Sequence, residues 1–457
     1  MLRLVVALLA LLTGCRTAPE RPPDLVVISI DTLSRGALRA FEPSAPEHPQ
    51  LDAFAREALR FQNAVTSAPW TLPAHASLIT GLYPNRHGAT DPRVKILPDA
   101  PTLAQALAAT GYETIALTDG VLVGRSYGFA RGFDRYDAFV RAPGPGAPVL
   151  PRDGKPMKMN GKNLFDRAIA FLEQRPKSAR PLFLFLHSYA VHDYFELHPW
   201  AAQGLAPERT QYQLLDCLDG TARCDAASWD LLRELYRREV DHFDAGFGRL
   251  REAMARAGYD ATAVVFVLSD HGEGLDPARG RIGHGGRVSE DLIRIPLLVH
   301  LPDRRGRDVV EPVSMVDLMP TLLELAGSLS PQGLYGRSFA PFLRGNARAA
   351  APRTLVAMEH AWLWKDGRRE LAPEIQPLPL SIALIRGDRW YLHTDSHDEL
   401  YDLASDPHQA RDLAPGARDR DAWQRELAQY TSERPTTPLR DPDAQLEEKL
   451  RALGYAR

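Results

Sequence analysis

Short apolar segments alternate with helical patterns along most of this 457-residue chain, and this alternation constrains the fold most strongly. The segments are continuously apolar, which is typical of strands buried on both faces of a sheet. They comprise residues 25–30, 114–117, 182–187, 264–269 and 295–301. Helical patterns occupy residues 51–59, 102–110, 164–174 and 230–258. The sequence therefore predicts an α/β fold, with a doubly wound and mostly parallel sheet covered by helices on both faces.

The pattern changes after residue 348. Residues 384–393 and 398–407 predict short antiparallel strands with a turn, and residues 443–454 predict a terminal helix. We therefore expect a large α/β domain over residues 24–348 and a small α+β C-terminal subdomain over residues 349–457. The Pro- and Gly-rich residues 142–156 predict a surface loop of the larger domain.

The N-terminal stretch MLRLVVALLALLTGC combines an early arginine with a short apolar run. The run is shorter than the roughly 20 residues that cross a bilayer, so it predicts a signal peptide. Its end resembles a bacterial lipobox, in which the cysteine, here Cys15, is lipidated and begins the mature chain. Arg16 then favours the outer membrane in a host that has two membranes. We expect residues 1–23 to be a lipoprotein signal peptide and tether, and the protein to lie in the bacterial cell envelope facing the periplasm. The alternative is a plain signal peptide with an incidental cysteine.

The cysteine content and the net charge limit which cellular compartment and which binding partners the protein can have. Cys217 and Cys224 are the other two of three cysteines, and in an oxidising compartment such a close pair predicts a disulfide. A thiolate metal site is the alternative, although two thiolates alone rarely complete one. The net charge of −3 provides no global field that would attract nucleic acid.

Polar residues follow three of the predicted strands at the point where each strand ends. They are Asp31, His187, His192, Asp270 and His271, and His284 follows after a short loop. Because the carboxyl ends of parallel strands meet at one edge of a sheet, we expect these side chains to cluster. Carboxylate oxygens and imidazole nitrogens suit Zn²⁺ or Mn²⁺ better than Ca²⁺. The alternative for each residue alone is a cap, a turn or a structural histidine.

Thr71 lies in the segment SAPWTLPAHASLITG, directly before an apparent helix over residues 72–80. One interpretation is a helix cap, because threonine is common there and Pro73 suits a first turn. The other is a nucleophile, because the free N–H groups of a helix start bind anions and a cation can activate a hydroxyl. The second interpretation requires the hydroxyl, the anion pocket and the cation to lie in one place.

Many collinear segments between residues 24 and 415 resemble the sulfatase family, within the alkaline phosphatase superfamily. They include VVISIDTL, FQNAVTSAPWTLPAHASLITGLYPNRHG, LFLFLHSYAVH, VVFVLSDHGEG, IRIPLLVHLP and ELYDLASDPHQARDLA. The resemblance implies a doubly wound catalytic domain, a small C-terminal subdomain, and metal-assisted cleavage of a sulfate or phosphate ester.

The chain departs from the family pattern at the residues that carry its chemistry. Sulfatases place Cys or Ser in C/S-x-P-S-R, and this residue is oxidised to formylglycine. The chain has Thr71 there, which cannot be converted, and His75 in place of the arginine. Thr32 replaces the second of two early aspartates, and His271 replaces an asparagine. Residues 118–123, TDGVLV, lack the lysine and histidine that would hold sulfate.

These departures resemble the superfamily's phosphodiesterases and phosphoethanolamine transferases, in which a zinc-bound threonine attacks phosphorus. By that resemblance the metal ligands are Asp31, Thr71, Asp270, His271 and His284, and the catalytic residues are Thr71, His75, His192 and His284. His192 and His284 would hold a second metal or protonate the leaving group. A two-metal site would need a further carboxylate, which the sequence does not identify. Arg287 is expected at the surface.

The sequence therefore predicts a metal-dependent hydrolase, with Zn²⁺ favoured over Mn²⁺ or Ca²⁺. Thr71 is the expected nucleophile, and phosphate esters are favoured over sulfate esters as substrates. The alternative is a non-catalytic lipoprotein of the same fold that binds a glycan or an envelope partner, which the altered motifs would allow.

Overall fold

The computed structural model describes residues 21–139, 164–176, 180–196, 198–205, 211–218, 224–276, 282–302, 304–345, 353–365, 368–394 and 397–431. Within them, eight strands form one sheet in the order β5-β4-β6-β1-β7-β8-β2-β9. These strands are β1 (Asp24–Ile30), β2 (Leu59–Phe61), β4 (Glu113–Asp119), β5 (Arg135–Phe139), β6 (Leu182–Ser188), β7 (Ala263–Ser269), β8 (Leu297–His300) and β9 (Arg307–Val309). Strand β1 pairs in parallel with β6 and β7, whereas β8 runs antiparallel to β7 and β2. The predicted mostly parallel sheet is confirmed.

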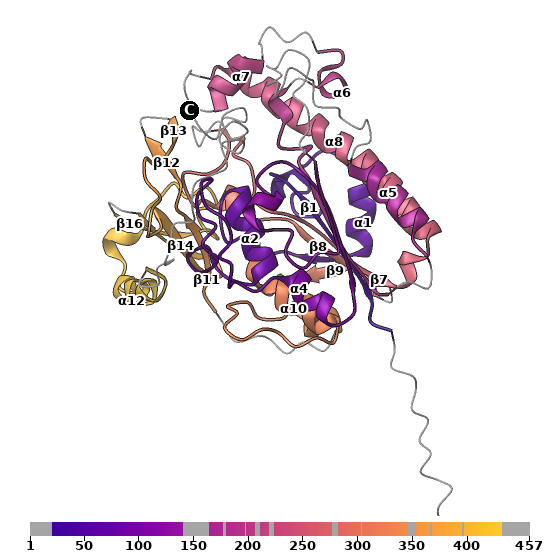
Figure 1. Cartoon of the computed structure of the whole chain (residues 1–457). Coiled ribbons are helices and arrows are strands. Elements are labelled where there is room, and N and C mark those ends of the chain that lie inside the picture. Colours follow the sequence, from indigo (N-terminus) through magenta and orange to yellow (C-terminus); the bar gives the residue numbers. More distant parts are fainter. Residues whose placement is uncertain are drawn as a thin grey trace, which may run out of the picture.

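Alternate residues of each strand point to opposite faces of the sheet. Both sets are mostly apolar in the central strand β1, so both faces of the sheet are covered by helices. The helices of the described segments are α1 (Pro49–Glu57), α2 (Thr71–Thr80), α3 (Pro84–His87), α4 (Leu103–Ala109), α5 (Leu164–Gln174), α6 (Pro199–Ala202), α7 (Gln211–Leu218), α8 (Ala226–Arg256), α9 (Glu290–Ile293), α10 (Leu318–Leu325), α11 (Ala340–Leu343) and α12 (Arg420–Thr431). Val26, Ile28 and Ile30 of β1 pack in one apolar cluster with residues of α1, α5 and α8. Leu25 and Val27 belong to the cluster on the other face, with residues of α2, α4 and α10. The sheet is therefore doubly wound, as predicted (Figure 1).

Helix α2 is buried along its whole length, from Thr71 to Thr80. Apart from His75, its residues are small or apolar on every side, which is typical of a helix inside a core. The helix ends at Gly81, whose φ of 66° gives the left-handed cap that glycine adopts without strain. The start of α2 is therefore held rigidly beneath the surface, beside the carboxyl ends of the central strands.

A small antiparallel sheet follows the main domain and confirms the C-terminal subdomain. Its order is β11-β14-β15-β16, with a separate hairpin of β12 and β13. The strands are β11 (Leu355–Glu359), β12 (Trp362–Lys365), β13 (Arg368–Leu371), β14 (Ser381–Arg386), β15 (Arg389–Thr394) and β16 (Asp398–Asp402), and a short pair, β3 (Ala64–Val65) and β10 (Val313–Ser314), lies in the main domain. The predicted segment 384–393 contains a tight turn at Gly387, where φ is 62°. The Met358 N–H donates to the Ser67 carbonyl at 2.9 Å, so the subdomain is attached beside the segment that leads into α2.

Some predicted features can be compared with the structure and others cannot. Cys217 and Cys224 form the predicted disulfide, with Cα atoms 5.1 Å apart, which excludes a thiolate metal site. The predicted signal peptide, the loop at 142–156 and the helix at 443–454 lie outside the described residues. Within the described residues, no helix has both the length and the apolar character needed to cross a membrane.

Candidate active site

The carboxyl ends of β1, β6 and β7 bring four polar side chains together. The parallel register sets Asp31, which follows β1, beside His187 of β6 and beside Asp270 and His271, which follow β7. His187 Nε2 lies 3.2 Å from Asp31 Oδ2, and His271 Nε2 lies 3.3 Å from Asp270 Oδ2. All four side chains are fully buried. The expected clustering at the strand ends is therefore what the structure contains.

The turn after β1 has an unusual backbone that fixes Asp31. Thr32 has a φ of 59°, in the left-handed region that costs a β-branched residue roughly 1–3 kcal/mol. Its N–H donates to Asp270 Oδ1 at 3.1 Å, and its carbonyl accepts from the Tyr236 hydroxyl at 2.9 Å. The Thr32 hydroxyl donates to the Asp31 carbonyl at 2.7 Å. Thr32, which stands at the family's second aspartate, therefore holds the turn and does not add a carboxylate to the cluster.

Thr71 is the first residue of α2, and its hydroxyl faces the cluster. Thr71 Oγ1 lies 3.2 Å from Asp31 Oδ2 and 3.3 Å from His271 Nε2. The N-cap of α2 is Trp70, and no side chain caps the helix. The capping interpretation of Thr71 is therefore not what the structure shows. The hydroxyl instead lies among carboxylate and imidazole groups at the N-terminus of a buried helix.

The cluster has the donor set of a cation site. His271 Nδ1 lies 2.9 Å from the Gly272 carbonyl, which can only accept, so Nδ1 carries the hydrogen and Nε2 presents a lone pair to the carboxylates. Burial lowers the pKa of His271 to about 3, which keeps the ring neutral, as a metal ligand must be. Asp31 Oδ1 and Asp270 Oδ2 are buried without a hydrogen-bond partner. Ligand atoms of Asp31, Asp270 and His271 all lie within 4.8 Å of one another, so these residues fit a divalent cation.

The two buried carboxylates respond to each other's charge. Burial, and then the charge of Asp31, raise the pKa of Asp270 well above its ordinary value. Burial opposes ionisation of Asp31 as well, but the hydrogen bond with His187 and the nearby histidines lower its pKa overall. Two anions in one buried site are unfavourable unless a positive charge lies between them. The electrostatics of the pair therefore also favour a cation.

His75 lies beneath Thr71 and has both ring nitrogens engaged by protein groups. Its Nδ1 donates to the Thr71 carbonyl at 3.0 Å, and its Nε2 accepts from the Ser29 hydroxyl at 2.9 Å. Its Nδ1 also lies 3.4 Å from Asp270 Oδ2, and with His187 these residues form a second group of candidate ligand atoms. His75, the predicted catalytic histidine in place of the family's arginine, therefore contacts the backbone of Thr71 at the start of α2.

His192 and His284 form the outer half of the site. Their ring centres lie 5.1 Å apart, and the His284 ring lies 4.6 Å from that of His271. His192 Nδ1 is 3.0 Å from Asp193 Oδ1. Burial lowers the pKa of His192, but the Asp193 hydrogen bond and nearby carboxylates outweigh it and raise the pKa overall. Burial keeps the pKa of His284 well below its ordinary value.

Glu273 is a site residue that the sequence did not single out. Its Oε2 lies 2.7 Å from His284 Nδ1, and its Oε1 accepts from the Tyr194 hydroxyl at 2.7 Å. His284 Nε2 is buried and has no hydrogen-bond partner, so this nitrogen is the one that remains available to a ligand. Glu273 stands two residues after His271 in DHGEG, and its position after a buried strand was the signal that could have found it.

Arg287 lies apart from this cluster. Its side chain is 38% exposed and forms an ion pair with Glu399 of β16 at 2.6 Å. This position agrees with the expected surface location.

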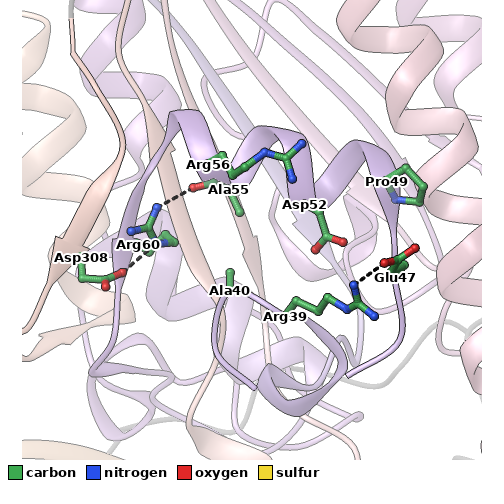
Figure 2. Close-up of a pocket in the computed structure, with 9 residues that line it drawn as sticks. All are labelled: Arg39, Ala40, Glu47, Pro49, Asp52, Ala55, Arg56, Arg60 and Asp308. Carbon is green, nitrogen blue, oxygen red and sulfur yellow. Dashed lines mark hydrogen bonds and ion pairs between the residues drawn. The ribbon is translucent and has the colours of Figure 1, made fainter. Parts of the chain in front are cut away.

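A cavity of about 630 Å³ lies beside α1 and shares no lining residue with the cluster (Figure 2). Its charges are largely paired, since Arg39 contacts Glu47 and Arg60 contacts Asp308. A second cavity, of about 470 Å³, includes Glu273 in its wall. The larger cavity is therefore separate from the cluster of hydroxyl, acidic and imidazole groups.

Comparison with known proteins decides the family. The family described as Sulfatase matches residues 23–328, about two thirds of the chain. The chain belongs to the sulfatase family. Residues 287–433 also match the family described as N-sulphoglucosamine sulphohydrolase, C-terminal, which covers the small sheet. The prediction of a sulfatase-like ester hydrolase is confirmed.

Several relatives show how this sulfatase-family chain compares. It is 26% identical to the steryl-sulfatase of Mus musculus over 88% of the chain and 80% of that protein. It is also 26% identical to the multifunctional alkaline phosphatase superfamily protein PehA of Trinickia caryophylli, over 80% of the chain and 85% of that protein. The solved structure of a 2-O GAG sulfatase superposes with a TM-score of 0.68 at 18% identity, covering 90% of this chain and 91% of the other. These matches confirm the fold and the superfamily.

Proposed function

We propose that this sulfatase-family hydrolase cleaves sulfate or phosphate esters with Thr71 as its nucleophile. The observation that carries the proposal is the position of Thr71 Oγ1, 3.2 Å from Asp31 Oδ2 and 3.3 Å from His271 Nε2, at the first residue of α2. The N–H groups of the first helical turn are suited to an anionic ester group beside the hydroxyl. The hydroxyl, the anion pocket and the acidic cluster therefore converge at one point.

The reaction would proceed in two steps through a threonine ester. The Thr71 hydroxyl releases its proton to solvent as Oγ forms a bond to sulfur or phosphorus and the bond from that atom to the alcohol oxygen breaks. The departing alcohol takes a proton from His192, the histidine whose pKa is raised. Water, which can donate to the unpaired Nε2 of His284, then attacks the same central atom, and the bond to Thr71 Oγ breaks. One proton of that water returns to the threonine oxygen and the other reprotonates His192 as sulfate or phosphate leaves.

Asp31, Asp270 and His271, with Thr71 beside them, are the residues that would hold a divalent cation. When bound, such a cation lowers the pKa of a nearby hydroxyl and neutralises negative charge. The mixture of carboxylate oxygen and imidazole nitrogen supports Zn²⁺ first, then Mn²⁺, with Ca²⁺ third. His75 and His187 supply the groups that position the backbone of Thr71 and the carboxylate of Asp31.

The matched family supports a sulfate ester, whereas two features of this chain support a phosphate ester. Thr71 cannot become formylglycine, and residues 118–123 lack the family's lysine and histidine. The test is a hydrolysis panel on purified protein that lacks residues 1–20. The panel comprises p-nitrophenyl sulfate, p-nitrophenyl phosphate, bis-p-nitrophenyl phosphate and p-nitrophenyl phenylphosphonate, each with Zn²⁺, Mn²⁺ or Ca²⁺. Turnover that a chelator removes and the metal restores is the expected result, and the preferred ester identifies the class. Absence of turnover on all four esters would favour the non-catalytic binding lipoprotein.

Glu273 is expected to position His284 for this reaction. The Glu273→Gln variant should lower kcat about 10- to 100-fold, because the carboxylate that fixes the imidazole loses its charge. A matched control is Glu239→Gln, since Glu239 is equally buried and lies 2.6 Å from His198 Nδ1 in a similar pair away from the cluster. Steady-state kinetics of both variants would test this role, and equal losses in the two variants would count against it.

We also propose that Cys15 anchors the protein to the outer membrane, facing the periplasm. The proposal is supported by the apolar run and the lipobox-like end of residues 1–15. Cells fed radiolabelled palmitate should label the full-length chain in the membrane fraction, and Cys15→Ser should abolish the label. A labelled Cys15→Ser chain would contradict the proposed anchor.

A further inference from the structure

The β12–β13 hairpin of the C-terminal subdomain forms a wall of the catalytic cluster. Trp362 of β12 packs edge-on against Trp70, the residue before Thr71, with ring centres 6.2 Å apart. On the other side, Gly285 has a φ of 77°, and a Cβ at this position would lie 3.1 Å from Trp362 Cδ1. The Gly285 N–H donates to the Pro69 carbonyl at 3.0 Å. The hairpin, the loop that carries His284 and the segment before α2 are therefore packed as one unit.

Arg369 of β13 places a positive charge at this wall. Its Nη1 donates to the His284 carbonyl at 3.0 Å, and its guanidinium carbon lies 5.0 Å from the centre of the Trp362 ring. Stacking on an indole ring holds a guanidinium in a defined orientation. Burial raises the pKa of Glu273 to about 7 and holds the pKa of His284 well below its ordinary value, and the charge of Arg369 acts on both groups in the lowering direction. Together with its hydrogen bond to the His284 carbonyl, this places Arg369 close to the groups on the outer side of the site.

The exposure of the site residues indicates where the alcohol part of a substrate would lie. Asp31, Asp270 and His271 are 0% exposed, whereas His284 is 6% and His192 is 7% exposed. An ester group that reaches Thr71 would therefore direct its alcohol part past His192 and His284. Arg369 borders the same side, through its hydrogen bond to His284.

We propose that Arg369 recognises a second anionic group on the alcohol part of the substrate, so that the enzyme prefers esters of polyanionic alcohols. This proposal rests on the proposed esterase function. A guanidinium binds a carboxylate, sulfate or phosphate through charge-assisted hydrogen bonds that a neutral group does not replace. The residue would act on substrate selection and not on the bond-breaking step.

The test compares two matched esters, a 4-nitrophenyl ester and the same ester with a 2-carboxylate. The sulfate or phosphate form is chosen by the wild-type preference. Arg369→Gln should raise KM for the carboxylated ester about 10- to 100-fold and change KM for the plain ester less than about twofold. Its kcat should change little for either ester, and Arg369→Lys should recover part of the loss. A matched control is Arg386→Gln in the small sheet, where Arg386 pairs with Glu426 and should affect neither ester.

Binding measurements separate this proposal from the esterase function on which it rests. Phenyl sulfate and 2-carboxyphenyl sulfate, or the corresponding phosphates, can be titrated calorimetrically into the Thr71→Ala chain with and without Arg369→Gln. A preference for the carboxylated ligand that disappears with Arg369→Gln supports the anion subsite, even where no ester is turned over. Equal effects on both ligands, or no preference to begin with, would overturn it and assign Arg369 to holding the hairpin.

Discussion

Replacement of Thr71 by alanine is expected to lower kcat/KM by at least about 1,000-fold on whichever ester the protein cleaves. The hydroxyl is the group that would attack, and alanine has no nucleophile to place between Asp31 and His271. Because the N-cap of α2 is Trp70 and no side chain caps it, the helix does not depend on this hydroxyl. The variant should lose the long hydrogen bond to Asp31, the contact with His271 Nε2 and a buried methyl group, which together correspond to about 1–2 kcal/mol of the free energy of unfolding.

The control for this prediction lies in the same helix. Thr80 is equally buried at the other end of α2, and its hydroxyl donates to the Ala76 carbonyl at 2.6 Å. Thr80→Ala should keep turnover within a few-fold, whereas Thr71→Ser should keep part of the activity because it keeps a hydroxyl. Mass spectrometry of the wild-type chain quenched during turnover should find the sulfo or phospho group on Thr71. Wild-type turnover by Thr71→Ala would remove the nucleophile assignment.

The central strands could be predicted from the sequence, whereas the edge strands could not. Strands β1, β6 and β7 are buried on both faces, so their runs of apolar residues are continuous. The edge strand β9 and its neighbour β2 have three residues each, and two of the three in β9 are exposed. Strands this short, and an edge strand this polar, are missed by any search for apolar runs. The antiparallel direction of β8 follows from its pairing and is not encoded in its apolar pattern.

The inner site could be predicted because it follows the ends of the strands. Asp31 and Asp270 each come directly after a buried strand, and the parallel register of these strands places the two carboxylates side by side. The outer site depends on contacts that no local pattern reveals. The Tyr194 hydroxyl bonds to Glu273 from 79 residues away, and Arg369 reaches the His284 carbonyl from 85 residues away. Sequence reasoning therefore found the candidate ligands and the hydroxyl, but missed the residues that orient the outer histidines.

Asp270→Asn is expected to separate two effects of the acidic cluster: it lowers the stability of the fold when no cation is present, and it binds the cation when one is present. In the presence of a chelator, this variant should melt about 2–5 °C above the wild-type chain. Burial and Asp31 raise the pKa of Asp270, so its folded form binds a proton more readily than its unfolded form. Asp270 therefore adds to the free energy of unfolding at low pH, where it is protonated. This contribution is lost as the pH rises from the ordinary carboxyl pKa to above the raised pKa of the folded chain. An asparagine keeps the oxygen that accepts from the N–H groups of Thr32 and His271, and it removes the charge.

With Zn²⁺ in place of the chelator, the wild-type chain should melt above Asp270→Asn. The wild-type chain should gain about 2.7 kcal/mol in free energy of unfolding when Zn²⁺ is present at about 100 times its Kd, and Asp270→Asn should gain far less and lose its turnover.

The control is Asp24→Asn at the other end of β1, because the Asp24 carboxylate is also buried but accepts from the Leu182 N–H and the Thr262 hydroxyl. That variant should melt lower than wild type with or without metal and should keep its response to Zn²⁺. Scanning calorimetry gives both results, and an Asp270→Asn chain that melts lower in chelator yet still responds to Zn²⁺ would show that the carboxylate pair is structural. The paired outcome matters because a buried structural aspartate and a cation ligand can look alike in a structure, but they respond in opposite directions to the loss of charge.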